Sequence, residues 1–195
     1  WSLQEAGMQL MRFKTGTPAR VDARTLDYTK MEPQYGDERV RNFSFMSTIT
    51  TRNQVPCYLT YTNPRTHQLL RENLDRSCMF IGLIDGVGPR YCPSIESKII
   101  RFADKDRHQL FLDPEGLRTN EVYVQGMSSS LPAEIQVAFM QTIPGLEHCK
   151  MMRAGYAIEY DCLDPLQLKA NLEHKAISGL FSAGQATGTS GYEEA

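Results

Sequence analysis

Strand patterns and helix patterns follow one another along this chain without a regular strand–helix–strand rhythm, and this order limits the possible folds more than any other feature. Residues 54–62 alternate in side-chain character, which is typical of a strand. Residues 131–145 instead place Ile135, Phe139 and Ile143 on one helical face, ahead of a Pro-Gly pair that ends a helix. The mixture without the rhythm of a parallel sheet predicts an α/β chain of the mixed, α+β type.

The remaining patterns predict short elements joined by turns. Asn63 suits a helix N-cap and Pro64 the first turn, so we expect a helix over 63–74 with Leu70 and Leu74 on one face. We expect further strands at 10–21, near 43–46 within an otherwise irregular 22–54, at 108–117 and 120–126 as a hairpin, at 155–161, and at the start of 179–195. Residues 2–9 are expected to end a helix, and 164–178 to hold a short helix or turn.

The composition is that of a globular chain with no strong charge. The 195 residues are 41% hydrophobic and 23% charged, with a formal net charge of −2. No apolar run is long enough to span a membrane, and no basic domain indicates nucleic-acid binding by charge alone. No signal peptide is recognisable. The first residue is Trp1 in place of an initiator Met, so we expect a fragment of a longer protein.

The cysteines indicate a reducing, cytoplasmic setting. There are five of them, and no two are close enough to form a Cys-x-x-Cys pair. The four histidines are also scattered, so no metal site is expected. Most of the cysteines are expected to pack as small hydrophobic side chains.

The C-terminal stretch "GLFSAGQATGTSGYEEA" (179–195) places Gly184, Gly188 and Gly191 between a short apolar strand and the start of a helix. Such a loop directs backbone N–H groups and the positive end of a helix dipole at an anion. The spacing differs from the usual dinucleotide fingerprint. Two interpretations therefore stay open here, a ligand-binding loop and a tight turn for strand–helix packing.

The stretch "GPRYCPSIESK" (88–98) carries a cysteine in a setting that can activate it. Arg90, Lys98 and Arg101 lie near Cys92 in the sequence, and positive charge favours the thiolate form. The following proline disfavours a helix, so we expect this thiol on a loop. A reactive thiol and an inert one are both compatible with these features.

Six stretches together are similar to one known family. They are "FKTGTPARVDARTLDY" (13–28), "QVPCYLTYTN" (54–63), "GPRYCPSIESKIIRF" (88–102), "LDPEG" (112–116), "GYAIEYD" (155–161) and "GLFSAGQATGTSGYEEA" (179–195). In this order they closely resemble the GidA/MnmG family of flavin-dependent tRNA uridine 5-carboxymethylaminomethyl modification enzymes. The likeness runs over nearly the whole chain.

The resemblance implies a cofactor set and partners. Members of that family bind FAD in a glutathione-reductase-like domain, reduce it with NADH, and take a one-carbon unit from methylenetetrahydrofolate. They act on the wobble uridine of tRNA as a homodimer together with the MnmE-type GTPase. Their chemistry implies a reduced flavin whose negative charge the helix start after the glycine loop would stabilise.

The resemblance also implies roles for particular residues. Cys92 is the catalytic candidate: its thiolate adds to carbon 6 of the uracil, or its thiol instead protonates or shields the flavin. Gln185 contacts FAD, beside Gly184, Gly188 and Gly191. The implied NAD segment comprises Gly88, Pro89, Arg90, Tyr91, Ser94, Ile95, Glu96, Lys98, Arg101 and Phe102. Arg90 and Lys98 would serve a tRNA phosphate equally well.

The resemblance further implies how the chain divides. Residues 1–20 would end one segment of the FAD domain, 21–150 would form a large inserted α/β domain, and 151–195 would return to the FAD domain. The N-terminal GxGxxG unit and the C-terminal helical domain of the family are not in this sequence. We therefore expect this chain alone to bind FAD weakly or not at all, and expect Cys92 and the glycine turn before Tyr192 to converge on one flavin pocket.

Three other functions remain to be weighed. The first is the folate- and FAD-dependent tRNA uridine methyltransferase, which shares the flavin fold. The second is a non-catalytic nucleic-acid-binding or scaffold fragment, against which the balanced charge counts. The third is an NADH oxidoreductase that needs no tRNA.

Overall fold

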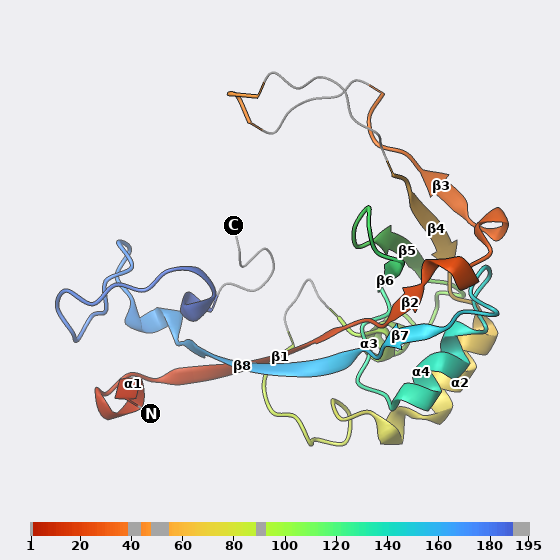
Figure 1. Ribbon diagram of the computed structural model, residues 1–195. Coiled ribbons are helices and arrows are strands. Elements are labelled where there is room, and N and C mark those ends of the chain that lie inside the picture. Colours follow the sequence, from red (N-terminus) through yellow and green to blue (C-terminus); the bar gives the residue numbers. More distant parts are fainter. Residues whose placement is uncertain (1, 39–43, 48–54, 89–92, 189–195) are drawn as a thin grey trace.

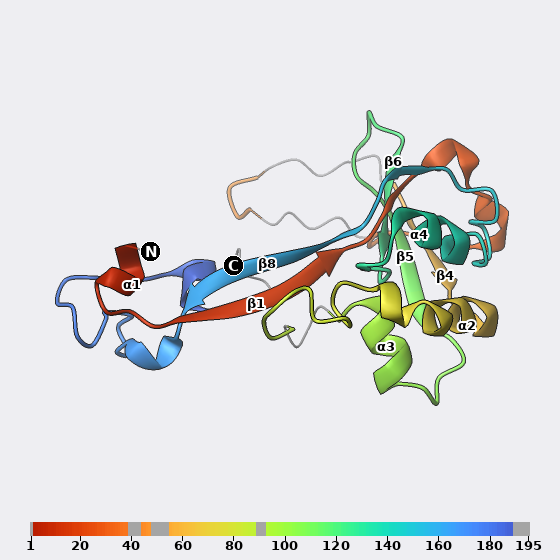
Figure 2. The same cartoon turned by 90° about the horizontal axis from the view of Figure 1, so that it is seen from below.

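The computed structural model describes residues 2–38, 44–47, 55–88 and 93–188. A body of sheet and helices lies at one end, and a long two-stranded ribbon runs from it to a smaller end region (Figures 1 and 2). The first helix and residues 164–188, which follow the ribbon, belong to this end region. The mixed α/β class expected from the sequence is confirmed.

The body contains a six-stranded sheet in which every pairing is antiparallel. The strand order is β3-β4-β5-β6-β2-β7. The bounds are β2 Arg20–Asp22, β3 Glu32–Gln34, β4 Cys57–Tyr61, β5 Gln109–Pro114, β6 Glu121–Gln125 and β7 Met151–Arg153. The expected hairpin at 108–126 is confirmed as β5 and β6, whose leucines and valines at alternate positions are buried.

Three helices pack on the sheet through one core: α2 Pro64–Glu72, α3 Ile95–Arg101 and α4 Ala133–Met140. The predicted cap of α2 is confirmed, because the Asn63 side chain accepts a hydrogen bond from the Thr66 N–H in a capping box. This helix ends at Glu72, so Leu74 belongs to the separate 3-10 turn that follows and not to the helix. At nine residues, α2 is far too short to cross a bilayer, and no other described helix could do so.

Helix α4 is shorter than the predicted segment, but its apolar face is as expected. Phe139 is buried within the helix, and Ile143 is buried in the turn that follows it. The Thr142 hydroxyl donates to the Phe139 carbonyl at 2.6 Å, which satisfies a carbonyl at the helix end. The stripe therefore continues beyond the helix itself.

The prediction of a strand near 43–46 is wrong. Residues 44–46, the described part of that segment, lie in a turn, with the Ser47 N–H donating to the Ser44 carbonyl. The extended segment is instead β3 at Glu32–Gln34, paired with β4. Pro33 argued against a strand in the sequence. A proline is nevertheless tolerated there, because β3 is an edge strand.

The ribbon consists of β1 Leu10–Thr17 and β8 Tyr156–Leu163, paired antiparallel from Leu10–Leu163 to Thr17–Tyr156. At its far end lie α1 Ser2–Glu5 and the short 3-10 turns at Pro165–Gln167 and Gly184–Thr187. The remaining 3-10 turns are Ala23–Thr25, Tyr28–Lys30 and Leu74–Arg76. The domain division at 20/21 and 150/151 stays a prediction; both ribbon strands lie on the outer side of those boundaries.

Candidate functional site

The predicted FAD loop forms a 3-10 turn, Gly184–Thr187, whose two ends have left-handed backbone. Gly184 has φ +66° and Gly188 has φ +80°, a region that favours glycine. A Cβ at Gly184 would meet no atom of the described part of the chain within 4 Å. Gln185 is exposed between them. The short strand expected just before the loop is wrong: Phe181 makes only an isolated bridge to Glu173.

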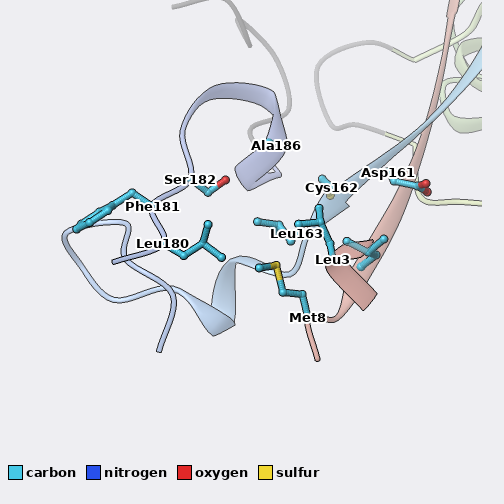
Figure 3. Close-up of a pocket in the computed structure, with 10 residues that line it drawn as sticks. Leu3, Met8, Asp161, Cys162, Leu163, Leu180, Phe181, Ser182 and Ala186 are labelled. Carbon is cyan, nitrogen blue, oxygen red and sulfur yellow. The ribbon is translucent and has the colours of Figure 1, made fainter. Parts of the chain in front are cut away.

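A cavity of about 350 Å³ lies beside this turn, between the ribbon, α1 and the loop (Figure 3). Its wall is mostly apolar, with Met8, Leu163 and Leu180 grouped around it. Asp161 also borders it, but the carboxylate points away and pairs with Arg12 at 2.6 Å. The cavity is therefore an uncharged, apolar space of a size typical of small-molecule sites.

The chain enters the predicted NAD segment beside the middle of β1. The Val87 N–H donates to the Arg12 carbonyl at 3.0 Å, and the Lys14 N–H donates to the Val87 carbonyl at 3.1 Å. Gly86 makes this close approach possible, because its φ is +116° and a Cβ there would lie 2.8 Å from the Arg12 carbonyl oxygen. The chain leading into the NAD segment is thereby fixed to β1.

A second, smaller cavity of about 130 Å³ lies between β1 and α3. The predicted NAD residues Gly88, Ser94 and Arg101 line it, together with residues that the sequence did not indicate. These others are Lys14, Thr15, Met79, Phe80, Pro93 and Ser97. The only sequence signal for Lys14 was a lysine in the strand that runs into the Gly-Thr-Pro turn of "FKTGTP". Arg101, its partner across the cavity, is far away in the sequence.

Not every predicted NAD residue faces this cavity. Ile95 and Glu96 are fully buried and present no surface to a ligand. Lys98 donates to the Gly126 carbonyl at 3.1 Å, and Phe102 is half exposed with its ring edge-on to His108. Helix α3 itself was missed; Ser94 caps it by accepting from the Ser97 N–H, and its Ile95–Ile99 spacing was the sign to use.

Glu96 joins three segments below the second cavity. Its Oε1 atom accepts hydrogen bonds from the Ser129 hydroxyl at 2.9 Å, the Ser130 N–H at 3.0 Å and the Ser77 hydroxyl at 3.4 Å. Its Oε2 atom is buried and has no hydrogen-bond partner. The carboxylate thus fixes the start of α3 to the loops at 77–80 and 128–130.

The ribbon connects the two cavities. Leu10 of β1 lines the first cavity, and Lys14 of the same strand lines the second. Four residues of strand correspond to about 13 Å. The FAD loop and the NAD segment therefore lie along one ribbon. Pro89, Arg90, Tyr91, Cys92 and Gly191 lie outside the described residues, so the convergence of Cys92 and the glycine turn stays a prediction.

The whole chain, residues 1–195, matches the model of the family described as Glucose inhibited division protein A. The chain belongs to the GidA family. It is 60% identical over 194 residues to the tRNA uridine 5-carboxymethylaminomethyl modification enzyme MnmG of Caldicellulosiruptor saccharolyticus, and 60% identical over 193 residues to that of Bacillus mycoides. These matches cover 100% and 99% of this chain, and 31% of each relative.

A solved structure of Aquifex aeolicus GidA in its form I crystal has the same fold as this GidA-family chain. The TM-score is 0.88 at 50% sequence identity, covering 98% of this chain and 33% of that one. The form II crystal gives a TM-score of 0.86 at 47% identity. The chain thus spans about a third of the length of the relatives it matches.

Three of the four described cysteines of this GidA-family chain, Cys57, Cys149 and Cys162, are poorly suited to be nucleophiles. Burial raises the pKa of Cys149 to about 11, and burial followed by Asp113 raises that of Cys57 to about 11. Burial, then Asp161 and Asp164, raises the pKa of Cys162. Each of these three thiols is protonated near neutral pH, which disfavours all three as nucleophiles.

Proposed function

We propose that this chain is part of an FAD- and NADH-dependent enzyme that modifies carbon 5 of the wobble uridine in tRNA with a carboxymethylaminomethyl or aminomethyl group. The observation that carries the proposal is the match of the entire chain, at 60% identity, to proteins named as MnmG modification enzymes. The names of these relatives favour this modification over the methyl group that a folate- and FAD-dependent tRNA uridine methyltransferase would add. The proposed assembly is a homodimer in the cytoplasm that works with an MnmE-type GTPase.

The residues around the first cavity suit part of an FAD molecule. The uncharged apolar wall accommodates a flat aromatic ring, and the open space at Gly184 lets a ligand approach the backbone. Gln185 is exposed beside them to hydrogen-bond a ring edge. The cavity holds only a portion of such a large cofactor, so the other contacts come from elsewhere in the protein. When bound, FAD would supply redox chemistry by accepting a hydride from NADH.

The uridine chemistry is assigned to Cys92. Its thiolate forms a sulfur–carbon bond to carbon 6 of the uracil, and the displaced electron pair makes carbon 5 nucleophilic. Glycine or ammonium displaces tetrahydrofolate from methylenetetrahydrofolate to give an iminium, and carbon 5 bonds to the iminium carbon while the C=N electron pair moves to nitrogen. Loss of the carbon 5 proton and departure of the thiolate restore the ring. Arg90, beside this cysteine in the sequence, favours the thiolate.

The test uses the full-length protein with its GTPase partner and undermodified tRNA. Cys92 is replaced by Ala and by Ser, and the wobble nucleoside is analysed by mass spectrometry. Loss of the modified nucleoside in both variants supports the covalent role. Cys57→Ala is the matched control, because the pKa of that thiol is raised to about 11, and it is expected to retain modification. Normal modification by Cys92→Ala would reject the nucleophile, and no modification by the unaltered enzyme would reject the function.

A further inference from the structure

We infer that the cavity between β1 and α3 holds a phosphate group, bound by Lys14 from the ribbon and Arg101 from the helix. This inference rests on the proposed function, whose ligands NADH and tRNA both carry phosphates. It adds a residue, Lys14, that lies outside the predicted NAD segment, and it names the chemical group that the cavity recognises. Its basis is the charge and hydrogen-bonding capacity of the lining residues.

The first step concerns charge. Lys14 and Arg101 line the same cavity, and among the residues that the structure describes neither forms an ion pair. The ribbon's other cation, Arg12, is instead paired with Glu159 and Asp161. Two cations that converge on one space without a carboxylate create a positive potential there, which favours an anion.

The second step concerns the acidic side chain of the same helix. Glu96 belongs to α3, the helix that supplies Arg101, and would compete with a bound anion if it faced the cavity. It is instead fully buried, and its Oε1 atom accepts hydrogen bonds from the Ser129 hydroxyl and the Ser130 N–H. The helix thereby presents its cation to the cavity and keeps its carboxylate in the core.

The third step concerns hydrogen-bond donors. Ser94 donates its hydroxyl proton to the Ser97 oxygen at 3.2 Å, so the Ser97 hydroxyl proton is available to a ligand. Lys14 uses one N–H on the Ile84 carbonyl at 3.3 Å and keeps two others. Cationic and hydroxyl donors of this kind suit the several oxygens of a phosphate group. The space of about 130 Å³ equals that of roughly four waters, which is room for one such group.

The fourth step concerns what is attached to the phosphate. Met79 and Phe80 form an apolar side of the same cavity, and Phe80 is 41% exposed. A sugar or a base carried by the phosphate can pack against these side chains while the charged group reaches Lys14 and Arg101. The phosphate therefore belongs to a nucleotide, either the dinucleotide cofactor or the tRNA backbone.

The test measures binding of NADH and of unmodified tRNA to the full-length protein and to its Lys14→Ala and Arg101→Ala variants. Each variant is expected to weaken one of these ligands by roughly ten- to hundred-fold, as for a lost charged hydrogen bond. Because both residues hold one group, the double variant is expected to lose less than the product of the two effects. Lys14→Arg, which keeps the charge, is expected to stay within a few-fold of the unaltered protein.

Arg118→Ala is the matched control, since Arg118 is an exposed cation between β5 and β6, and it is expected to change neither affinity. Weakened NADH alone identifies the cofactor phosphate, and weakened tRNA alone identifies the backbone. Unchanged binding of both ligands in both alanine variants overturns the site while the proposed function stands. If the unaltered protein binds neither ligand, the proposed function fails, and inorganic pyrophosphate decides the site: binding lost in Lys14→Ala supports it, and no binding overturns it.

Discussion

Replacing Glu96 by Ala tests whether one buried carboxylate holds the α3 region together. The change removes the acceptor of the Ser129 hydroxyl at 2.9 Å and of the Ser130 N–H at 3.0 Å, and leaves both donors buried. An unsatisfied buried donor costs about 1–3 kcal/mol, and the lost side-chain volume adds to this. Since removing the buried charge offsets part of the cost, we expect a net destabilisation of about 2–4 kcal/mol.

Glu96→Gln separates the hydrogen bonds from the charge. The amide oxygen can replace Oε1 as acceptor, and the amide nitrogen would take the place of Oε2, which has no partner. We therefore expect Glu96→Gln to cost less than about 1 kcal/mol, far less than the alanine variant. The order of stability should be wild type and Gln close together, with Ala well below.

The assay is hydrogen exchange of the full-length protein, followed on peptides that cover 77–80 and 128–131, together with the melting temperature. Glu96→Ala should speed exchange in both peptides and lower Tm by about 4–16 °C, at 2–4 °C for each kcal/mol. Glu134→Ala serves as control, because Glu134 pairs with Arg76 at an exposed site. If Glu96→Ala exchanges and melts like Glu96→Gln, the carboxylate does not anchor these loops and the reasoning is refuted.

Three other perturbations follow from the structure. Burial chiefly lowers the pKa of His67, with His108 and Arg71 adding to it and Asp106 opposing, and burial with Lys98 lowers that of His108. The unfolded chain therefore binds protons first as pH falls below about 6.5, so the free energy of unfolding should fall there by at most about 1.4 kcal/mol per pH unit for each histidine. Tm measured from pH 8 to 5 should drop accordingly; a flat profile, or an equal drop in His108→Gln, would contradict this. Gly188→Ala places a side chain at φ +80°, which should cost about 1–2 kcal/mol and weaken FAD binding measured by flavin fluorescence, whereas Gly116→Ala should have no effect on the flavin. Gly86→Ala puts a Cβ 2.8 Å from the Arg12 carbonyl oxygen and should free the loop before α3, seen as faster proteolysis within 78–88; unchanged cleavage would show that the loop is held by other contacts.

The ribbon has a consequence for how the two predicted ligand stretches cooperate. β1 contributes Leu10 to the apolar cavity and Lys14 to the basic one, and β8 holds β1 in register along its full length. A paired strand has little freedom to change its length, so the spacing of the two cavities is fixed at about 13 Å along the strand. Ligands at the two ends would be positioned relative to one another by the ribbon.

Local elements were predictable where the signal is local. The Asn63-Pro64 cap of α2 and the β5–β6 hairpin depend on neighbouring residues and were confirmed. Edge strand β3 was missed because a proline, here Pro33, usually argues against a strand. A proline is tolerated in an edge strand, and only the sheet shows that β3 is one. Helix α3 was missed because seven residues give a weak helical pattern.

The sequence by itself determined the family, through stretches such as "RYCPSIE" and "GTSGYEEA", and the glycines that permit the left-handed backbone of the predicted FAD loop. Only the tertiary structure decided that, within α3, Glu96 is buried in the core while Arg101 faces a cavity completed by Lys14. The physical reason is that burial and electrostatic environment arise from contacts between segments far apart in the chain, and no local pattern encodes which of several charged residues will be desolvated.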